Sequence, residues 1–507
     1  MIENPTPARA EGVSRRRFLK AVGFTLAAGG RLAAAASEAR PEPRPNFVVV
    51  FTDDQGYQDV GCFGSPKIRT PRLDALARGG RRFTSFYAQT VCGPSRAALM
   101  TGCYPLRVAK KNNRVEVHPR LHAKEITLAE VLKQVGYATA AFGKWDLAGH
   151  SQTRFEPDLL PTRQGFDTFF GTPTSNDSRV DLYRDEKLLE KSADMAQLTR
   201  RYTDEAIAFL RASKAGPFFL YLAHTMPHTR LAASKPFRGK SKRGLYGDVI
   251  EEIDWNVGRI VDEVRDLGLA ERTYVIFTSD NGPWAIKGPH GGSAAPLRGA
   301  KTSTWEGGLR VPCIVWAPGR VPPGTSCDEV ASTMDLLPTL AKLAGASVPT
   351  DRVIDGHDIT PLLHGTPGAK SPTEAYYYYQ HTHLQAVRSG KWKLHLPRPA
   401  EPPWTPKWAR HIKPEDVIEI PKPMLFDLET DIGERNDVAD KHPDVVARLL
   451  KLAERAREDI GDYNRAGKGA RSFDPGPKRP DLVSRPAGRK RRKPRQTEPK
   501  KASGDRT

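Results

Sequence analysis

The sequence predicts an α/β protein with a large, mainly parallel sheet sandwiched between helices, followed by a smaller α+β domain with an antiparallel sheet. Three observations predict this architecture. Short, continuously apolar runs are typical of strands that are buried on both faces. Amphipathic helical stripes alternate with these runs. Beyond residue 370 the pattern changes to short, aromatic, hairpin-like segments.

Five apolar runs in the first part of the chain are predicted strands. They cover residues 46–52, 137–142, 217–223, 273–278 and 311–316. Four helices are predicted between them: one from a Thr70 cap to Gly79, one from a Thr127 cap to Gly136, one over residues 198–210 and one over residues 249–264. Such alternation favours parallel strands, because each crossover helix returns the chain to the same edge of the sheet.

The second part predicts a different topology. Its elements are strands at 376–379, 386–395 and 425–428 and a helix at 443–459. A Ser-Gly pair at 389–390 is typical of a hairpin turn. We therefore expect a large domain over residues 46–370 and a smaller domain over residues 371–475.

Charge is concentrated at the two ends of the chain. The 507 residues hold 79 Lys and Arg against 59 Asp and Glu, a net charge of +20. Residues 476–507 alone hold twelve basic and three acidic residues, which predicts a disordered basic tail. Five cysteines exclude a disulfide scaffold, and no apolar run is long enough to span a membrane. We predict neither a nucleic-acid partner nor a transmembrane segment.

The N-terminus predicts export. Residues 14–20 (SRRRFLK) precede a short apolar stretch and an Ala-rich cleavage region, so residues 1–36 are expected to be a signal peptide and 37–45 a linker. The SRRxFLK core resembles a twin-arginine (Tat) signal. It implies the Tat export machinery as a partner and a periplasmic or extracellular location, reached after the protein has folded.

Polar residues follow four of the predicted strands. They are Asp53-Asp54, Lys144 with Asp146, His224 with His228, and Asp280-Asn281. Because ligands of open α/β sheets bind beyond the carboxyl ends of the strands, we expect these side chains to meet. Close carboxylates repel unless a cation lies between them, and oxygen ligands favour calcium or magnesium over zinc. Asp-Asp and Asp-Asn-Gly are also common turn formers.

Cys92 is expected at or just before a helix N-terminus, because Pro94 suits the first turn of a helix. Three interpretations remain open on this basis alone: a thiol nucleophile of low pKa, an inert thiol, or a modified residue.

The segment Cys-Gly-Pro-Ser-Arg-Ala-Ala-Leu-Met-Thr-Gly, residues 92–102, resembles the C-x-P-S-R-x-x-x-x-T-G signature of type I sulfatases. Segments such as Gly143-Lys-Trp, Ser279-Asp-Asn-Gly-Pro and Trp305-Glu-Gly-Gly agree in the same order, over about residues 45–465. The resemblance implies an alkaline-phosphatase-like fold. It also implies that a formylglycine-generating maturation enzyme oxidises Cys92 to formylglycine, whose hydrate is the nucleophile.

The resemblance further implies a role for each matching residue. Calcium, rather than magnesium, would be held by Asp53, Asp54, Asp280, Asn281 and the modified residue 92. Arg96 would orient the hydrate, Lys144 and Lys301 would bind sulfate oxygens, and His228 would protonate the leaving alcohol. The implied substrates are sulfate monoesters, either small molecules or oligosaccharides, and a sulfated carbohydrate is expected.

One position departs from the family pattern, which reads Gly-Lys-Trp-His. Here Asp146 replaces the histidine. We expect Asp146 to act as the base for sulfate elimination. The alternatives are that His150 reaches the site, that the elimination step is slower, or that Asp146 is only a turn residue. His290 and Arg298, in the loop before Lys301, either contact the substrate or belong to a solvated loop.

Two other functions remain as alternatives. A phosphoryl hydrolase on the same scaffold would use Ser or Thr as the nucleophile and two metals with His ligands, which the Cys92 signature opposes. A non-catalytic polyanion-binding protein is favoured only by the loss of histidine at position 146 and by the basic tail.

Overall fold

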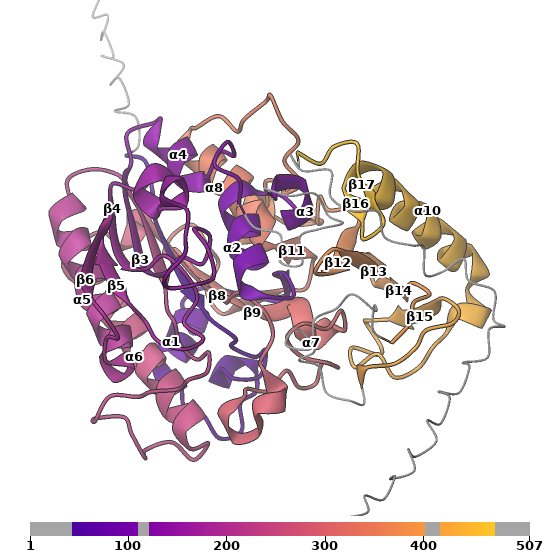
Figure 1. Cartoon of the computed structure of the whole chain (residues 1–507), viewed down its shortest axis with the longest axis horizontal. Coiled ribbons are helices and arrows are strands. Elements are labelled where there is room, and N and C mark those ends of the chain that lie inside the picture. Colours follow the sequence, from indigo (N-terminus) through magenta and orange to yellow (C-terminus); the bar gives the residue numbers. More distant parts are fainter. Residues whose placement is uncertain (1–42, 110–120, 401–415, 472–507) are drawn as a thin grey trace, which may run out of the picture. The chain divides into compact units, whose positions relative to one another are not determined.

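The computed structural model describes residues 43–109, 121–400 and 416–471 (Figure 1). These residues belong to a single compact unit that begins at Pro43. The predicted signal peptide (1–36) and the predicted basic tail (476–507) lie outside the described residues. No helix within the described ranges combines the length and the apolar character that a membrane span requires.

An 11-stranded sheet forms the centre of this unit, in the order β10-β2-β9-β8-β1-β7-β3-β4-β5-β6, with β11 paired to β2. Its strands are β1 (Asn46–Thr52), β2 (Arg81–Tyr87), β3 (Ala138–Lys144), β4 (Thr168–Thr172), β5 (Leu182–Arg184), β6 (Lys187–Glu190), β7 (Phe218–Ala223), β8 (Thr273–Ser279), β9 (Arg310–Trp316), β10 (Thr325–Cys327) and β11 (Ala331–Ser332). The central strands β8, β1, β7, β3 and β4 are parallel. The predicted mainly parallel sheet is therefore confirmed.

Strand β9 is antiparallel to both of its neighbours, β8 and β2. The sequence predicts it correctly as a strand at 311–316 but does not give its direction. The strands absent from the prediction are β2, β4 and the short strands toward the two edges. Strand β2 (RRFTSFY) mixes polar and apolar residues, and β6 is largely exposed, so neither shows the continuous apolar run of a buried strand.

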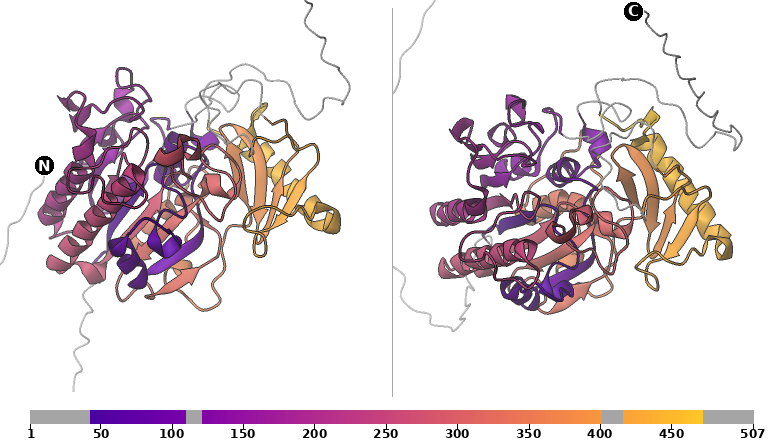
Figure 2. Two further views of the ribbon diagram at one scale, coloured as in Figure 1. Left: turned by 90° about the horizontal axis from the view of Figure 1, so that it is seen from below. Right: turned by 60° about the horizontal axis from the view of Figure 1, so that its bottom comes forward.

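Helices cover both faces of the sheet (Figures 1 and 2). The helices of this part of the chain are α1 (Pro71–Arg78), α2 (Cys92–Thr101), α3 (Pro105–Val108), α4 (Leu128–Lys133), α5 (Met195–Ser213), α6 (Leu245–Asp266), α7 (Glu306–Leu309), α8 (Leu336–Ala344) and α9 (Thr360–Leu363). Alternate residues of β1 face opposite cores: Phe47 and Phe51 pack with α2, α4 and α8, whereas Val48 and Val50 pack with α1, α5 and α6.

Thr70 and Thr127 are the N-cap residues of α1 and α4, as predicted. Thr127 forms a capping box with Glu130 at the start of α4. The Thr70 side chain makes no capping hydrogen bond, because its hydroxyl accepts from the Gly61 N–H and donates to Asp74 Oδ1. The first turn of α1 is satisfied by Asp254 of α6, which accepts hydrogen bonds from the backbone N–H groups of Arg72 and Leu73.

A second, antiparallel sheet follows, as predicted. It comprises β12 (Tyr376–Gln380), β13 (His383–Ser389), β14 (Trp392–His395) and β15 (Met424–Asp427), and α10 (Pro443–Asp459) packs against it. The Ser389-Gly390 turn joins β13 to β14, with Gly390 at a φ of 58°. A short pair, β16 (Gly461–Asp462) and β17 (Arg465–Ala466), ends the described chain.

Candidate active site

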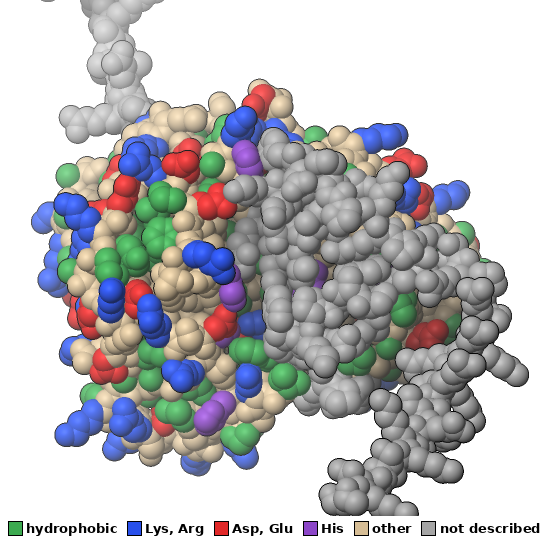
Figure 3. All heavy atoms as spheres, viewed as in Figure 1, with side chains coloured by type: hydrophobic (Ala, Val, Ile, Leu, Met, Phe, Trp, Pro, Cys, Tyr) green, Lys and Arg blue, Asp and Glu red, His purple; other side chains and the backbone are tan. Residues whose placement is uncertain are grey.

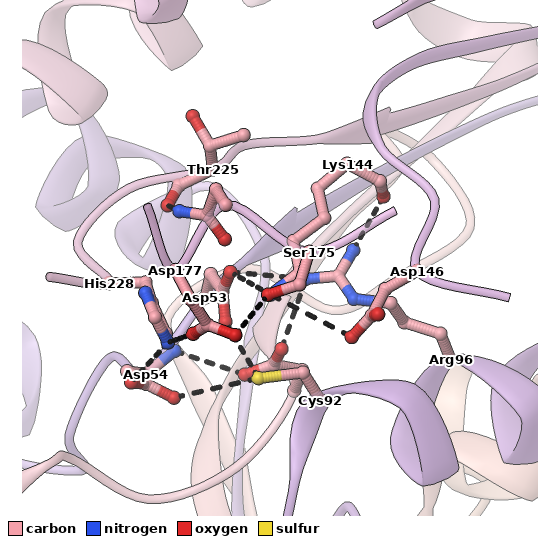
Figure 4. Close-up of polar contacts among 12 residues, drawn as sticks. Asp53, Asp54, Cys92, Arg96, Lys144, Asp146, Ser175, Asp177, Thr225 and His228 are labelled. Carbon is pink, nitrogen blue, oxygen red and sulfur yellow. Dashed lines mark hydrogen bonds and ion pairs between the residues drawn. The ribbon is translucent and has the colours of Figure 1, made fainter. Parts of the chain in front are cut away.

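The carboxyl ends of the parallel strands bring the predicted residues together (Figure 4). Asp53 and Asp54 follow β1, Lys144 ends β3, His228 follows β7, and Asp280 follows β8. All of these side chains are almost fully buried. Asp54 and Asp146 have φ values of 64° and 53°, a left-handed conformation that Asp adopts more readily than most residues, so both positions turn the backbone sharply beside the site.

Cys92 is the first residue of α2, and Arg96 lies one turn further along the same helix. The Cys92 Sγ atom is 3.1 Å from Asp53 Oδ1 and 3.4 Å from Lys301 Nζ. Burial, followed by the charges of Asp280 and Asp53, raises the pKa of the Cys92 thiol well above its ordinary value. The unmodified side chain is therefore a neutral thiol at physiological pH, which speaks against a thiolate nucleophile.

Four groups at the pocket floor have the arrangement of a cation site. One ligand atom from each of Asp53, Asp54, Cys92 and Asp280 lies within 4.8 Å of the others. Asn281 joins this cluster, since its Nδ2 donates to Asp54 Oδ1 at 2.8 Å. The buried atoms Asp54 Oδ2 and Asn281 Oδ1 have no hydrogen-bond partner among the residues that the structure describes. Orphaned oxygens of this kind fit a hard divalent cation such as calcium or magnesium.

Burial, and then the charge of Asp53, raises the pKa of Asp280 to about 8. The pKa of Asp53 is instead lowered: burial alone would raise it, but Lys144, His228 and Arg96 outweigh that effect. Without a bound cation, ionisation of the Asp280 carboxyl is therefore unfavourable. A divalent cation beside it would favour the ionised form.

Three cations surround the carboxylates. Lys144 Nζ is 2.7 Å from Asp53 Oδ2, and Lys301 Nζ is 2.6 Å from Asp54 Oδ1. Arg96 contacts Asp280 at 3.0 Å and donates to the Lys144 carbonyl oxygen at 2.7 Å. Burial alone would lower the pKa of either lysine, but the neighbouring carboxylates outweigh it and raise both values, so the two ammonium groups stay charged.

A chain of histidines and carboxylates forms one wall of the pocket. His228 Nε2 is 3.3 Å from Asp177 Oδ1 and 3.7 Å from Asp54 Oδ2. His150 Nε2 lies 2.7 Å from Asp177 Oδ2, and its Nδ1 lies 3.6 Å from Asp146 Oδ1. Asp146 Oδ2 is in turn 3.9 Å from Lys144 Nζ. Both alternatives at the altered position, Asp146 and His150, therefore line the site.

Sequence reasoning missed Asp177, which bridges the two histidines. It follows β4, a strand that the sequence does not predict, and the Asn-Asp-Ser segment around it reads as an ordinary turn. Trp284 was also missed; its ring centroid is 5.1 Å from that of His228. The sequence feature that could have identified Trp284 is its position four residues after Asp280, just beyond the end of β8.

The pocket above these groups has a volume of about 850 Å³. Its lining includes Cys92, Asp146, His228 and Lys301, together with His290 from the loop before Lys301. Arg298 from the same loop does not line it. That side chain lies over the Trp305 ring, 3.6 Å from the centroid, and pairs with Asp416 at 3.3 Å.

Comparison with known proteins gives consistent results over most of the chain. The Sulfatase family model matches residues 45–346, and a model of the C-terminal region of aryl-sulfatase matches residues 371–475. A model of the N-sulphoglucosamine sulphohydrolase C-terminal region matches residues 300–394.

Curated relatives match over similar lengths. Arylsulfatase A of Homo sapiens is 37% identical, with 83% of this chain and 89% of that protein covered. N-acetylgalactosamine-6-sulfatase of Canis lupus familiaris is 35% identical, with 86% and 89% covered. Steryl-sulfatase of Mus musculus is 36% identical, with 83% and 82% covered.

Solved structures agree with these matches. Ps i-CgsB superimposes with a TM-score of 0.69 at 27% identity, covering 84% of this chain and 95% of that chain. The PsFucS1 sulfatase from Pseudoalteromonas sp. gives a TM-score of 0.70 at 25% identity, covering 81% and 89%. The chain therefore belongs to the type I sulfatases of the alkaline-phosphatase superfamily and is a sulfuric ester hydrolase.

Proposed function

We propose that this protein hydrolyses a sulfate monoester of a carbohydrate, with residue 92 converted to formylglycine and calcium held beside it. The observation that carries the proposal is the placement of Cys92 Sγ among Asp53, Asp54 and Lys301, at the N-terminus of α2. Support for a carbohydrate comes from the complex of Ps i-CgsB with k-i-k-neocarrahexaose and from the matches to N-acetylgalactosamine-6-sulfatases.

Calcium, held by Asp53, Asp54, Asp280, Asn281 and residue 92, would polarise the sulfate oxygens and lower the pKa of a hydroxyl on residue 92. The hydrated aldehyde of formylglycine offers one hydroxyl to attack sulfur and a second whose deprotonation expels sulfate. Lys144 and Lys301 place two permanent positive charges at the pocket floor, where they attract sulfate and offset charge developing on its oxygens. Arg96 fixes the floor by binding Asp280 and the Lys144 carbonyl.

We assign the two proton transfers to two different side chains of the pocket wall, His228 and Asp146. His228 lines the pocket, with Asp177 beside its Nε2 atom. In its protonated form, His228 donates a proton to the leaving alcohol. Asp146 takes the proton from the second hydroxyl of residue 92. His150 holds Asp146 from the solvent side, so it acts as a positioning residue for that carboxylate.

The N-terminal signal supports export by the Tat route after folding and maturation in the cytoplasm. That order would allow a formylglycine-generating enzyme to modify Cys92 first. The proposed location is periplasmic or extracellular. We also propose that the exported protein consists of a catalytic domain (46–370) and a C-terminal domain (371–475).

Two measurements test the proposal. The mass of the tryptic region around residues 83–107 should be lower than the unmodified sequence by about 18 Da, the change from thiol to aldehyde. The mature protein should turn over an aryl sulfate far faster than an aryl phosphate. Cys92→Ala should abolish both signals, whereas Cys103→Ala, which replaces a buried cysteine in the neighbouring tryptic peptide, should keep them. Full activity with an unmodified cysteine would contradict the proposal.

A further inference from the structure

Two cations at the mouth of the pocket have no part in the chemistry proposed above. Arg230 lies in the loop after β7, and Lys287 lies in the short 3-10 segment Ala285–His290. Both side chains are exposed and line the pocket. Arg230 donates to the Ser178 carbonyl oxygen at 2.9 Å, but within the described ranges neither cation has a carboxylate partner.

The carboxylates of the pocket lining do not neutralise these cations. Among the described residues of that lining, the two acidic ones are Asp146 and Asp177, and His150 contacts both of them. Lys144 is a further partner of Asp146, and His228 is a further partner of Asp177. The positive charge at the mouth is therefore available to a ligand.

Trp284 links the mouth to the floor of the pocket. Lys287 Nζ lies 4.1 Å from the centroid of its ring, and Lys301 Nζ lies 4.7 Å from the same centroid. The two ammonium groups are therefore no more than about 9 Å apart. Contact with the ring also restricts Lys287, which lowers the entropy cost of using it to bind an anion.

The positive charge at the mouth is local. Figure 3 shows basic and acidic side chains intermixed over the visible described surface, without one continuous basic area. A broad surface that binds polyanions would differ from this pattern, because it needs many positively charged side chains next to one another. The pocket volume of about 850 Å³ is much larger than a single sulfate group needs, which leaves room for an attached sugar and its neighbours.

We propose that Arg230 and Lys287 form a subsite for a second anionic group of the substrate, a sulfate or a carboxylate on the same sugar as the scissile sulfate or on the adjoining one. This inference rests on the proposed function, and it narrows the substrate class to saccharides with at least two anionic groups. Lys144 and Lys301 would hold the scissile sulfate, while Arg230 and Lys287 would hold the second anion and fix the orientation of the sugar.

The test compares substrates that differ in the second anion. The mature protein is assayed on a neutral disaccharide with one sulfate, the same disaccharide with two sulfates, and a singly sulfated disaccharide that carries a uronate carboxylate. The expected result is a higher kcat/KM for one or both two-anion substrates, with an advantage that declines as salt rises. Comparing the second and third substrates tells a sulfate subsite from a carboxylate subsite.

The double variant Arg230→Ala/Lys287→Ala should reduce the ratio of kcat/KM on the preferred two-anion substrate to that on the one-anion substrate about tenfold, mainly through KM. The matched control is Arg200→Ala/Lys187→Ala, which removes one exposed arginine and one exposed lysine on α5 and β6, outside the pocket lining. An unchanged ratio, or equal losses on every substrate, would overturn the subsite. Failure of the wild-type protein to cleave any sulfate ester would instead contradict the proposed function.

Discussion

At the pocket floor, three buried carboxylates meet three buried cations within a few ångströms. Arg96 and two lysines neutralise Asp53, Asp54 and Asp280, yet two oxygens of the cluster have no hydrogen-bond donor within the described part of the chain. A divalent cation would use those oxygens and leave the lysines free to bind sulfate. The sequence could predict the residue types at this floor, because a cluster of buried acids needs either a cation or bound protons to offset the repulsion between its carboxylates.

Replacing Asp146 tests whether this residue, which stands at the altered position of the family motif, acts as the base for sulfate elimination. Asp146→Asn keeps the size and the left-handed backbone preference but removes the base, so the first half-reaction should proceed and the second should slow by about 100-fold or more. Sulfated protein should then accumulate, visible as a burst of released alcohol and as a mass increase of one SO3 group.

The matched control for that variant is Asp185→Asn. Asp185 also has a positive φ, 54°, but it lies outside the pocket lining, so its replacement should leave turnover unchanged. If Asp146 were only a turn residue, Asp146→Asn would behave in the same way, and unchanged turnover in both variants would reject Asp146 as the base.

His150 should make the stability of the protein depend on pH. Contacts with Asp146 and then Asp177 raise the pKa of this histidine to about 9, against 6.5 for an unperturbed side chain. A raised histidine pKa contributes stability that is fully present below about pH 6.5 and is lost as the pH rises toward 9. Because the His150 side chain is 55% exposed, the contribution is expected to be modest.

Urea unfolding at several pH values between about 6 and 9 measures this contribution. His150→Gln should lower the unfolding free energy at the acid end of that range and converge with the wild type at the alkaline end. His290→Gln is the control, since His290 lines the same pocket without a carboxylate partner within the described ranges. Parallel curves for the wild type and His150→Gln would contradict the prediction.

At the scale of secondary-structure elements, the prediction succeeded where burial was complete. The continuous apolar runs of β1, β7 and β8 identified strands, and parallel pairing then placed the polar residues after them at one edge. Strand β2 was missed because it is partly polar, and β4 was missed because it is short. Since β4 was not predicted, the loop after it, which carries Asp177, was not recognised as part of the site. Contacts between distant elements, such as α6 with α1, leave no local pattern in the sequence.

The contact between α6 and α1 leads to a stability prediction. Asp254 is buried and accepts hydrogen bonds from the N–H groups of Arg72 and Leu73, at 3.2 and 2.7 Å. Asp254→Ala should lower the unfolding free energy by about 1–3 kcal/mol, because one buried and one part-buried N–H group lose their acceptor. Asp266→Ala, near the exposed end of the same helix, should change it by less than about 0.5 kcal/mol in the same urea titration. Equal effects of the two substitutions would show that Asp254 does not cap α1.

At the scale of the whole molecule, buried ionic contacts join the C-terminal sheet to the catalytic loop region. Glu306 of α7 accepts from the hydroxyls of Tyr87, on β2, and Tyr378, on β12, at 2.6 and 2.7 Å. Lys393 of β14 lies 3.0 Å from Glu306 and 2.8 Å from Glu434, and all three charged side chains are fully buried. Glu306 lies five residues after Lys301, so these contacts also support the loop that carries a proposed sulfate-binding lysine.

Lys393→Met should therefore destabilise the protein as a whole rather than only its C-terminal part. The variant leaves two buried carboxylates without their shared cation, which costs about 3–5 kcal/mol. Lys391→Met is the matched control, because Lys391 is part-exposed and pairs with Asp427 at 2.7 Å, an interaction worth about 1 kcal/mol or less. Urea unfolding followed by far-UV circular dichroism and by loss of aryl sulfatase activity should give one coincident transition, shifted only in Lys393→Met. If circular dichroism showed an early separate transition while activity kept its wild-type midpoint, the C-terminal sheet would be an independent unit, and the coupling between Glu306 and the Lys301 loop would be refuted.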